Sequence, residues 1–135
     1  MNFKKIAFVT SIIAFVLGIG YLFFGSFVIG RWQIEPTNSV LLLGRRIGIL
    51  YLGLSVIFFL SKSLSVSKAR TALSIGAALT LSLLAFLGIF EYSQGTVGAG
   101  ILASVSIESL LSIGYIIILV KERRAMAMES LLNKT

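Results

Sequence analysis

The stretch IAFVTSIIAFVLGIGYLFFGSFVIG, residues 6–30, contains no charged side chain. A helix needs about 20 mostly apolar residues to cross the hydrocarbon core of a membrane. Lys4 and Lys5 precede the stretch, as in a secretory signal peptide, but its apolar part exceeds the roughly 7–15 residues of such a signal, and no A-x-A-like cleavage site follows. We therefore expect residues 6–30 to form a retained transmembrane helix.

Three further apolar stretches follow, over residues 40–60, 69–90 and 97–120. The segments between the four stretches are short and polar: RWQIEPTNS with the only proline, then SKSLSVSK, then EYSQGT. These features predict an all-α integral membrane bundle of four transmembrane helices, in a single domain of residues 1–135. The tail, residues 121–135, is expected in the cytoplasm, where its pattern allows a short amphipathic helix on the membrane surface.

The composition agrees with a membrane protein and narrows its chemistry. Hydrophobic residues make up 57% of the 135 residues and charged residues 13%, whereas soluble domains carry about 25% charged residues. The chain has no Cys and no His, which excludes disulfides, thiol chemistry, a Ser-His-Asp triad and His- or Cys-ligated metals. We expect no metal and no cofactor, and an enzyme is less well supported than a binding protein.

The net charge of +7, from 12 Lys and Arg against 5 Asp and Glu, reports orientation. If both termini lie on one side of the membrane, nine of the 12 basic residues lie there too. That side holds Lys4, Lys5, Lys62, Lys68, Arg70, Lys121, Arg123, Arg124 and Lys134, and the other side holds Arg31, Arg45 and Arg46. Because basic residues favour the cytoplasmic side, we expect both termini in the cytoplasm, with the chain in a bacterial-type inner membrane. No basic stripe with interleaved aromatics supports nucleic-acid binding.

Small and polar residues recur at helical spacing in each span. Such residues let membrane helices approach closely, so they predict either packing within a bundle or a contact between two copies of the chain. The stripes are Ser11, Ala14, Gly18, Tyr21 and Gly25; Gly44, Gly48, Tyr51 and Ser55; Ala72, Gly76, Thr80 and, beyond them, Glu91; and Ser104, Glu108, Ser112 and Tyr115. Trp32, beside Arg31, is expected to anchor the chain at the membrane interface.

Glu108 is the carboxylate inside the fourth predicted span. Counted from residue 97 at about 1.5 Å per residue, it lies about 16 Å from the outer face, near the midplane. A carboxylate at this depth must be protonated, paired or in contact with water. Ser104, Ser112 and Tyr115 share its helix face and are candidate hydrogen-bond partners. Glu108 therefore has one of two roles. It is a neutral side chain that stabilises packing by a hydrogen bond to a neighbouring helix, or it is a site for a ligand or a proton.

Arg45 and Arg46 lie in the first two turns of the second span. They project about 100° apart, and Arg46 is expected to extend to the lipid phosphates. Arg45 lies nearer the glycine stripe, where it could pair with Glu108 or Glu91 and lower the cost of burying either charge. The alternative is that both arginines are interfacial anchors of a helix that begins late.

Together these residues predict a polar-lined cleft that opens outward. Arg45 and Glu91 would lie near its mouth and Glu108 at its bottom, and the residues around it would be Tyr21, Tyr51, Ser112 and Tyr115. Tyrosine offers an apolar wall with one hydrogen-bonding tip. Such a cleft suits a membrane lipid or another amphiphile, with its head on Arg45 and its tail among aliphatic side chains. The other expected partners are a second copy of the chain and another membrane protein.

The second span opens with Arg-x-x-Gly, from Arg45 to Gly48, and continues with Leu-Gly-Leu, from Leu52 to Leu54. In this motif, which covers about one helix, and in its four spans, the chain resembles the small four-helix DoxX-like bacterial membrane proteins. The resemblance implies a four-helix membrane fold and no established activity. We predict a small integral membrane protein that binds a lipid or amphiphile, or acts as an accessory subunit. The alternative is a proton-coupled small-molecule transporter that uses Glu108.

Overall fold

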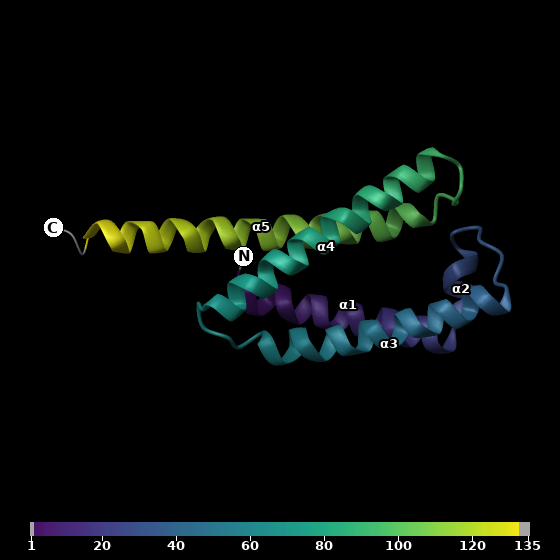
Figure 1. The fold of residues 1–135 in the computed structure, drawn as a ribbon, viewed down its shortest axis with the longest axis horizontal. Helices are drawn as coiled ribbons and strands as arrows, with labels where there is room; N and C mark the ends of the chain where they lie inside the picture. The colour runs from purple at the N-terminus through teal and green to yellow at the C-terminus, as the bar shows by residue number, and fades with distance from the viewer. Residues whose placement is uncertain (1, 133–135) are drawn as a thin grey trace.

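A computed structural model describes residues 2–132 and is all-helical over this range (Figure 1). The helices are α1 (Phe3–Phe23), α2 (Gly25–Gly30), α3 (Asn38–Ser61), α4 (Lys68–Ser93) and α5 (Ile101–Leu132). Helices α1, α3 and α4, and the part Ile101–Ala125 of α5, are long and apolar enough to cross a membrane. The expected all-α fold with four membrane-spanning helices is confirmed.

Three of the long helices begin at side-chain caps. Asn2, Thr37 and Ser67 precede α1, α3 and α4, and each side-chain oxygen accepts a hydrogen bond from a backbone N–H in the first turn, at 3.2 to 3.4 Å. Such a bond satisfies one of the amide groups that a helix leaves unpaired at its start. The polar residues that end the loops therefore decide where α1, α3 and α4 begin.

The first helix differs from the expected span over residues 6–30. It ends at Phe23, and the backbone of Phe24, with φ −124° and ψ 30°, departs from helical geometry before α2 begins at Gly25. Helix α2 then turns away from the axis of α1 (Figure 1). Hydropathy does not indicate this break, because Phe24 and α2 are as apolar as α1. The one local indication is Gly25, since glycine is the poorest helix former after proline.

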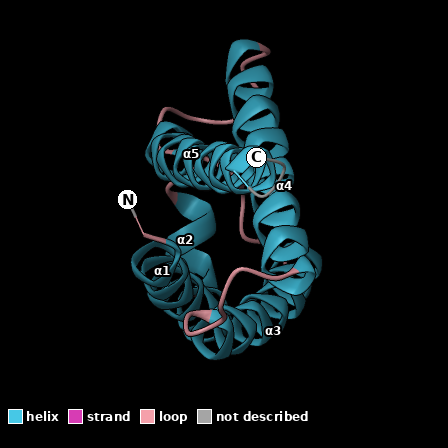
Figure 2. Ribbon diagram, turned by 90° about the vertical axis from the view of Figure 1, so that its left-hand side faces the viewer, coloured by secondary structure: helices cyan, strands magenta, loops and turns pink. Residues whose placement is uncertain are grey.

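The long helices pair as two antiparallel hairpins, α1 with α3 and α4 with α5 (Figures 1 and 2). Glycines set both contacts. A Cβ added to Gly48 of α3 would lie 2.9 Å from the carbonyl oxygen of Gly18 on α1, and one added to Gly88 of α4 would lie 2.6 Å from a methyl group of Val105 on α5. The glycine stripes of the first two spans are thus a packing face within one chain.

At the end where α1 begins, apolar and polar contacts join the two hairpins. Phe3 and Ala7 of α1 lie in one buried cluster with Tyr115 and Ile118 of α5. The guanidinium of Arg70, at the start of α4, lies 4.5 Å from the centre of the Phe3 ring. Within the second hairpin, Arg70 also forms an ion pair with Glu122 of α5.

At the opposite end, the two long loops contact each other. The backbone N–H of Gly98 donates a hydrogen bond of 2.7 Å to the carbonyl oxygen of Trp32. A Cβ added to Gly100 would lie 2.1 Å from the carbonyl oxygen of Arg31, so only glycine fits there. The hairpins are therefore joined at both ends, with the space between them framed by all four long helices.

The last helix continues beyond the expected span over residues 97–120. Helix α5 runs to Leu132 along the same axis (Figure 1), so the tail does not form a separate helix on the membrane surface over the described residues. The reason is local, because the segment after residue 120 contains neither Gly nor Pro and is rich in strong helix formers. Residues 133–135 of the expected tail lie outside the described residues.

Candidate functional site

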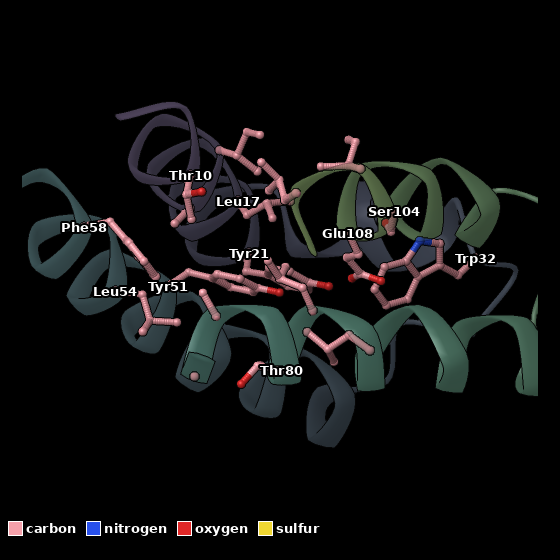
Figure 3. A pocket seen from close by; sticks show the side chains of 18 residues that line it. Thr10, Leu17, Tyr21, Trp32, Tyr51, Leu54, Phe58, Thr80, Ser104 and Glu108 are labelled. Atoms are coloured by element: carbon pink, nitrogen blue, oxygen red, sulfur yellow. The ribbon is translucent and has the colours of Figure 1, made fainter. Parts of the chain in front are cut away.

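A cavity of about 230 Å³ lies between the two hairpins, lined by all four long helices and one loop residue (Figure 3). Its walls are mainly aliphatic. The polar and aromatic side chains that line it are Thr10, Tyr21, Trp32, Tyr51, Phe58, Thr80, Ser104 and Glu108. Small-molecule sites usually measure about 300–1,000 Å³, so this cavity has room for a small ligand or for one end of a longer amphiphile.

Helical spacing explains which side chains reach the cavity. On α3, Tyr51, Leu54 and Phe58 lie three and four residues apart and form one face. On α5, Ser104 and Glu108 lie one turn apart on the face that points between the hairpins. The cavity is thus built from the inward faces of helices whose other faces pack together or point outward.

Among the described residues, Glu108 is the only one lining the cavity that can carry a full charge at neutral pH. None of the Lys and Arg side chains that the structure describes lines the cavity, and Glu108 itself is partly buried. An ionised carboxylate without a partner is costly in such surroundings. The cavity therefore presents a carboxyl group that is either neutral or in contact with water, and no described residue of the lining offers it a basic counter-ion.

Three aromatic rings border the carboxyl group. The rings of Tyr21 and Tyr51 stack with their centroids 6.0 Å apart, and Trp32 meets Tyr21 edge-on with centroids 6.4 Å apart. In Figure 3 the hydroxyl ends of both tyrosines point toward the part of the cavity that holds Glu108 and Trp32. The cavity consequently has one end that holds the carboxyl group and a mainly apolar end, where the hydroxyl of Thr10 already accepts a hydrogen bond from Tyr115.

Three of the residues expected to share a site do so. Glu108, Tyr21 and Tyr51 come from different helices and line the same cavity. The depth of Glu108 is counted from Ile101, where α5 begins, and not from residue 97. Glu108 lies about 10 Å into the helix, nearer to the middle of the span Ile101–Ala125 than to its loop end.

Tyr115 and Ser112 share the broad helix face of Glu108 but do not line the cavity. The fully buried Tyr115 donates a hydrogen bond of 3.0 Å to Thr10 of α1. Ser112 donates to the carbonyl oxygen of Ala78 on α4 at 3.0 Å. Both lie further along α5 than Glu108 and bond to neighbouring helices. Tyr115 and Ser112 therefore join α5 to α1 and α4, and they form these hydrogen bonds in place of the expected ones to Glu108.

Arg45 also lies away from the cavity. Its side chain is exposed and lines a separate recess beside the break between α1 and α2. Arg45 precedes Tyr51 by six residues, which places the two about 120° apart around α3. When Tyr51 faces the cavity, Arg45 therefore cannot, and the expected pairing of Arg45 with Glu108 is not formed.

Glu91, the other expected mouth residue, lies at the end of α4. Its carboxylate accepts a hydrogen bond of 2.5 Å from the hydroxyl of Thr96 in the following turn. The last residue of α4 that lines the cavity is Leu84, about 10 Å before Glu91 along the helix. The expected mouth of Arg45 and Glu91 is therefore absent from this cavity.

Trp32 is the cavity residue that sequence reasoning placed elsewhere, at the membrane interface. It follows α2 in a loop, and its position depends on the hydrogen bond from Gly98 in the other hairpin and on Gln33, whose φ of 60° is unusual for a non-glycine residue. Loop residues have no periodic signal, so only the contact between the two loops could locate this ring.

The fold and site define a small four-helix membrane protein with a carboxyl group in an aromatic-lined cavity between its helices. Comparison of the chain with protein-family models, curated proteins and solved structures finds no match. The resemblance to DoxX-like proteins stays a prediction.

Proposed function

We propose that the protein binds a lipid or another amphiphilic small molecule in the cavity between its hairpins. The observation that carries this proposal is the unequal chemistry of the two ends of the cavity. Glu108, Ser104 and Trp32 lie at one end, whereas Leu54 and Phe58 lie at the other (Figure 3). Thr10 also lies at this second end, but its hydroxyl is bonded to Tyr115. A molecule with a polar head and an apolar tail satisfies both ends at once, because each part then meets surroundings of its own kind.

The proposed setting is the bacterial inner membrane, with both termini in the cytoplasm. The distribution of the basic residues supports this orientation. The loop end of the bundle, where Trp32 contacts Gly98, would then face outward, and the polar end of the cavity would lie on that side. Membrane lipids are the nearest source of such a ligand, and an accessory role would follow if the bound molecule is passed to a partner membrane protein.

The single tryptophan of the chain provides a direct test of binding. Because Trp32 is the only Trp and lines the cavity, bromine atoms brought into the cavity should quench the intrinsic tryptophan fluorescence. The probe is 2-bromoundecyl maltoside, whose bromine lies beside the head group and therefore at the Trp32 end of the cavity, added to the purified protein in digitonin micelles. We expect quenching that saturates with probe concentration. Quenching that rises linearly without saturation would contradict a binding site.

Two glycine variants show whether the quenching comes from the cavity. A Cβ added to Gly76 or to Gly53 would meet no atom within 4 Å, but of these two glycines only Gly76 lines the cavity. Gly76→Leu should therefore fill the cavity and abolish saturable quenching, whereas Gly53→Leu should bind the probe like the wild type. Equal binding by both variants would locate the probe outside the cavity and overturn the proposal.

The second candidate function is a proton-coupled transporter of small molecules. It is favoured by the position of Glu108, an acid in a cavity without a basic partner, since an acid that releases its proton leaves a site for a cation. Radiolabelled tetraethylammonium is a suitable probe in proteoliposomes because it crosses a bilayer poorly. Uptake driven by a proton gradient and lost in Glu108→Gln would establish transport. Binding without such uptake would leave the binding or accessory role.

A further inference from the structure

The charges around the cavity distinguish among the ligands that the proposed function allows. Over the part of the chain that the structure describes, its lining contains one carboxyl group, Glu108, and no basic side chain. An anionic head group would meet a carboxylate with no cation to offset the repulsion. A neutral head group would leave an ionised carboxylate unpaired, or require it to stay protonated. Only a positively charged head group supplies the counter-ion that the surroundings of Glu108 lack.

The aromatic rings beside Glu108 favour the same charge. The face of an aromatic ring carries negative electrostatic potential and attracts cations within about 6 Å, with Trp the most effective and Tyr close behind. Trp32, Tyr21 and Tyr51 all line the cavity, and the tyrosine hydroxyl ends point toward the end where Glu108 lies (Figure 3). A carboxylate and several aromatic rings around one volume are a suitable environment for a quaternary or protonated amine.

Contacts with other parts of the protein hold these rings in place. Tyr21 stacks on Tyr51 and meets the edge-on ring of Trp32. The backbone of Trp32 is fixed in turn by the hydrogen bond of 2.7 Å from Gly98. A site that is already ordered loses less conformational entropy when it binds its ligand, so the rings can contribute to affinity without first being immobilised.

We infer that the polar end of the cavity takes a cationic head group, a quaternary or protonated amine, with Glu108 as its counter-ion and Trp32, Tyr21 and Tyr51 around it. This inference rests on the proposed function, because it names the class of amphiphile that the cavity binds. The apolar tail would lie along aliphatic side chains such as Ile13, Leu17 and Leu81.

The test compares three ligands as competitors of the brominated maltoside at Trp32. Decyltrimethylammonium has a permanent positive charge, its analogue ending in a tert-butyl group has the same shape without the charge, and decyl sulfate is an anion. We expect the cation to displace the probe at a concentration at least about tenfold lower than the neutral analogue, and decyl sulfate to be weaker still. Equal displacement by the cation and the neutral analogue would overturn the inference.

Variants of two glutamates provide the matched pair. Glu108→Gln should remove most of the advantage of the cation over the neutral analogue, whereas Glu91→Gln, outside the cavity, should keep it. An unchanged cation preference in Glu108→Gln would overturn the inference. If Glu108→Gln does not fold, as judged by circular dichroism and gel filtration, the ligand series on the wild type still decides.

The two proposals fail in different ways in this experiment. If the brominated maltoside gives no saturable quenching in the wild type, the proposed function itself is wrong. If the probe binds but is displaced equally well by all three competitors, the cavity binds amphiphiles without regard to charge, and only the inference about the head group is wrong.

Discussion

The rings of Tyr21 on α1 and Tyr51 on α3 stack with their planes 6° apart and their centroids 6.0 Å apart. Aromatic pairs of this kind stabilise a fold by about 0.5–1.5 kcal/mol beyond the burial of their area. The same pair forms one wall of the cavity. The contact that helps to hold the first hairpin together therefore also shapes the proposed binding site.

Removal of the Tyr51 ring should weaken cation binding. In Tyr51→Ala we expect the affinity for decyltrimethylammonium to fall about 3- to 30-fold, because one cation–π contact of about 0.5–2 kcal/mol is lost. Tyr51→Phe keeps the ring and should bind within about threefold of the wild type. Tyr92→Ala is the control, since Tyr92 is exposed and outside the cavity. Equal loss in Tyr51→Ala and Tyr92→Ala would contradict a role for the Tyr51 ring.

Cation binding should depend on pH through Glu108. A proton and a cation compete for the same carboxylate, so affinity should rise as the pH increases through the titration of Glu108. The other ionisable groups that line the cavity are Tyr21 of α1 and Tyr51 of α3, and α4 contributes none. Displacement by decyltrimethylammonium, whose charge does not titrate, measures the effect. The wild type should show this rise and Glu108→Gln a flat profile; a flat wild-type profile would contradict the assignment.

A methyl group at Gly48 should separate α1 from α3. Its Cβ would lie 2.9 Å from the carbonyl oxygen of Gly18, so the backbones must move apart. We expect Gly48→Ala to lower the free energy of unfolding by about 1–3 kcal/mol, measured by thermal or denaturant unfolding in detergent. Gly53→Ala, on the same helix and in open space, should be neutral or stabilising. Similar destabilisation by both variants would show that loss of glycine, and not the helix contact, is responsible.

The ion pair of Arg70 and Glu122 should matter most when only one partner is removed. The two side chains are 15% and 10% exposed, and loss of one partner of a buried pair costs about 3–5 kcal/mol. We expect Arg70→Met to destabilise the protein strongly and the double variant Arg70→Met, Glu122→Leu to recover most of that loss. Unfolding measurements on the wild type, the single variants Arg70→Met and Glu122→Leu, and the double variant give the coupling energy between the two side chains. Additive effects of the two substitutions would contradict a coupled pair.

Reporter fusions can test the orientation. Alkaline phosphatase, which is active only outside the cytoplasm, should be inactive when fused after Thr135 and active when fused after Gly95, in the turn between α4 and α5. The physical reason is the excess of basic residues at the end of the bundle that holds both termini, because basic residues favour the cytoplasmic side. The opposite pattern of activity would show that both termini lie outside the cytoplasm.

Part of the site was predictable because helical spacing is a local property. Tyr21, Tyr51 and Glu108 lie on polar or small-residue faces of their helices, and those faces turn toward the interior. The same spacing predicts Tyr115 and Arg45 beside them. A side chain reaches the cavity, however, only if both its angle around the helix axis and its position along that axis are suitable. Tyr115 has the right angle and lies too far along α5, while Arg45 lies at the wrong angle on α3.

The sequence by itself determined four apolar helices and the polar segments between them, because length and hydropathy are properties of consecutive residues. The tertiary structure decided which helices pair, where the first span breaks at Phe24, and that Trp32 lines the same cavity as Glu108. Those features depend on contacts between residues far apart in the chain, such as Gly18 with Gly48 and Trp32 with Gly98. A cavity exists only where such contacts hold two helix pairs together at both ends and leave the space between them unfilled.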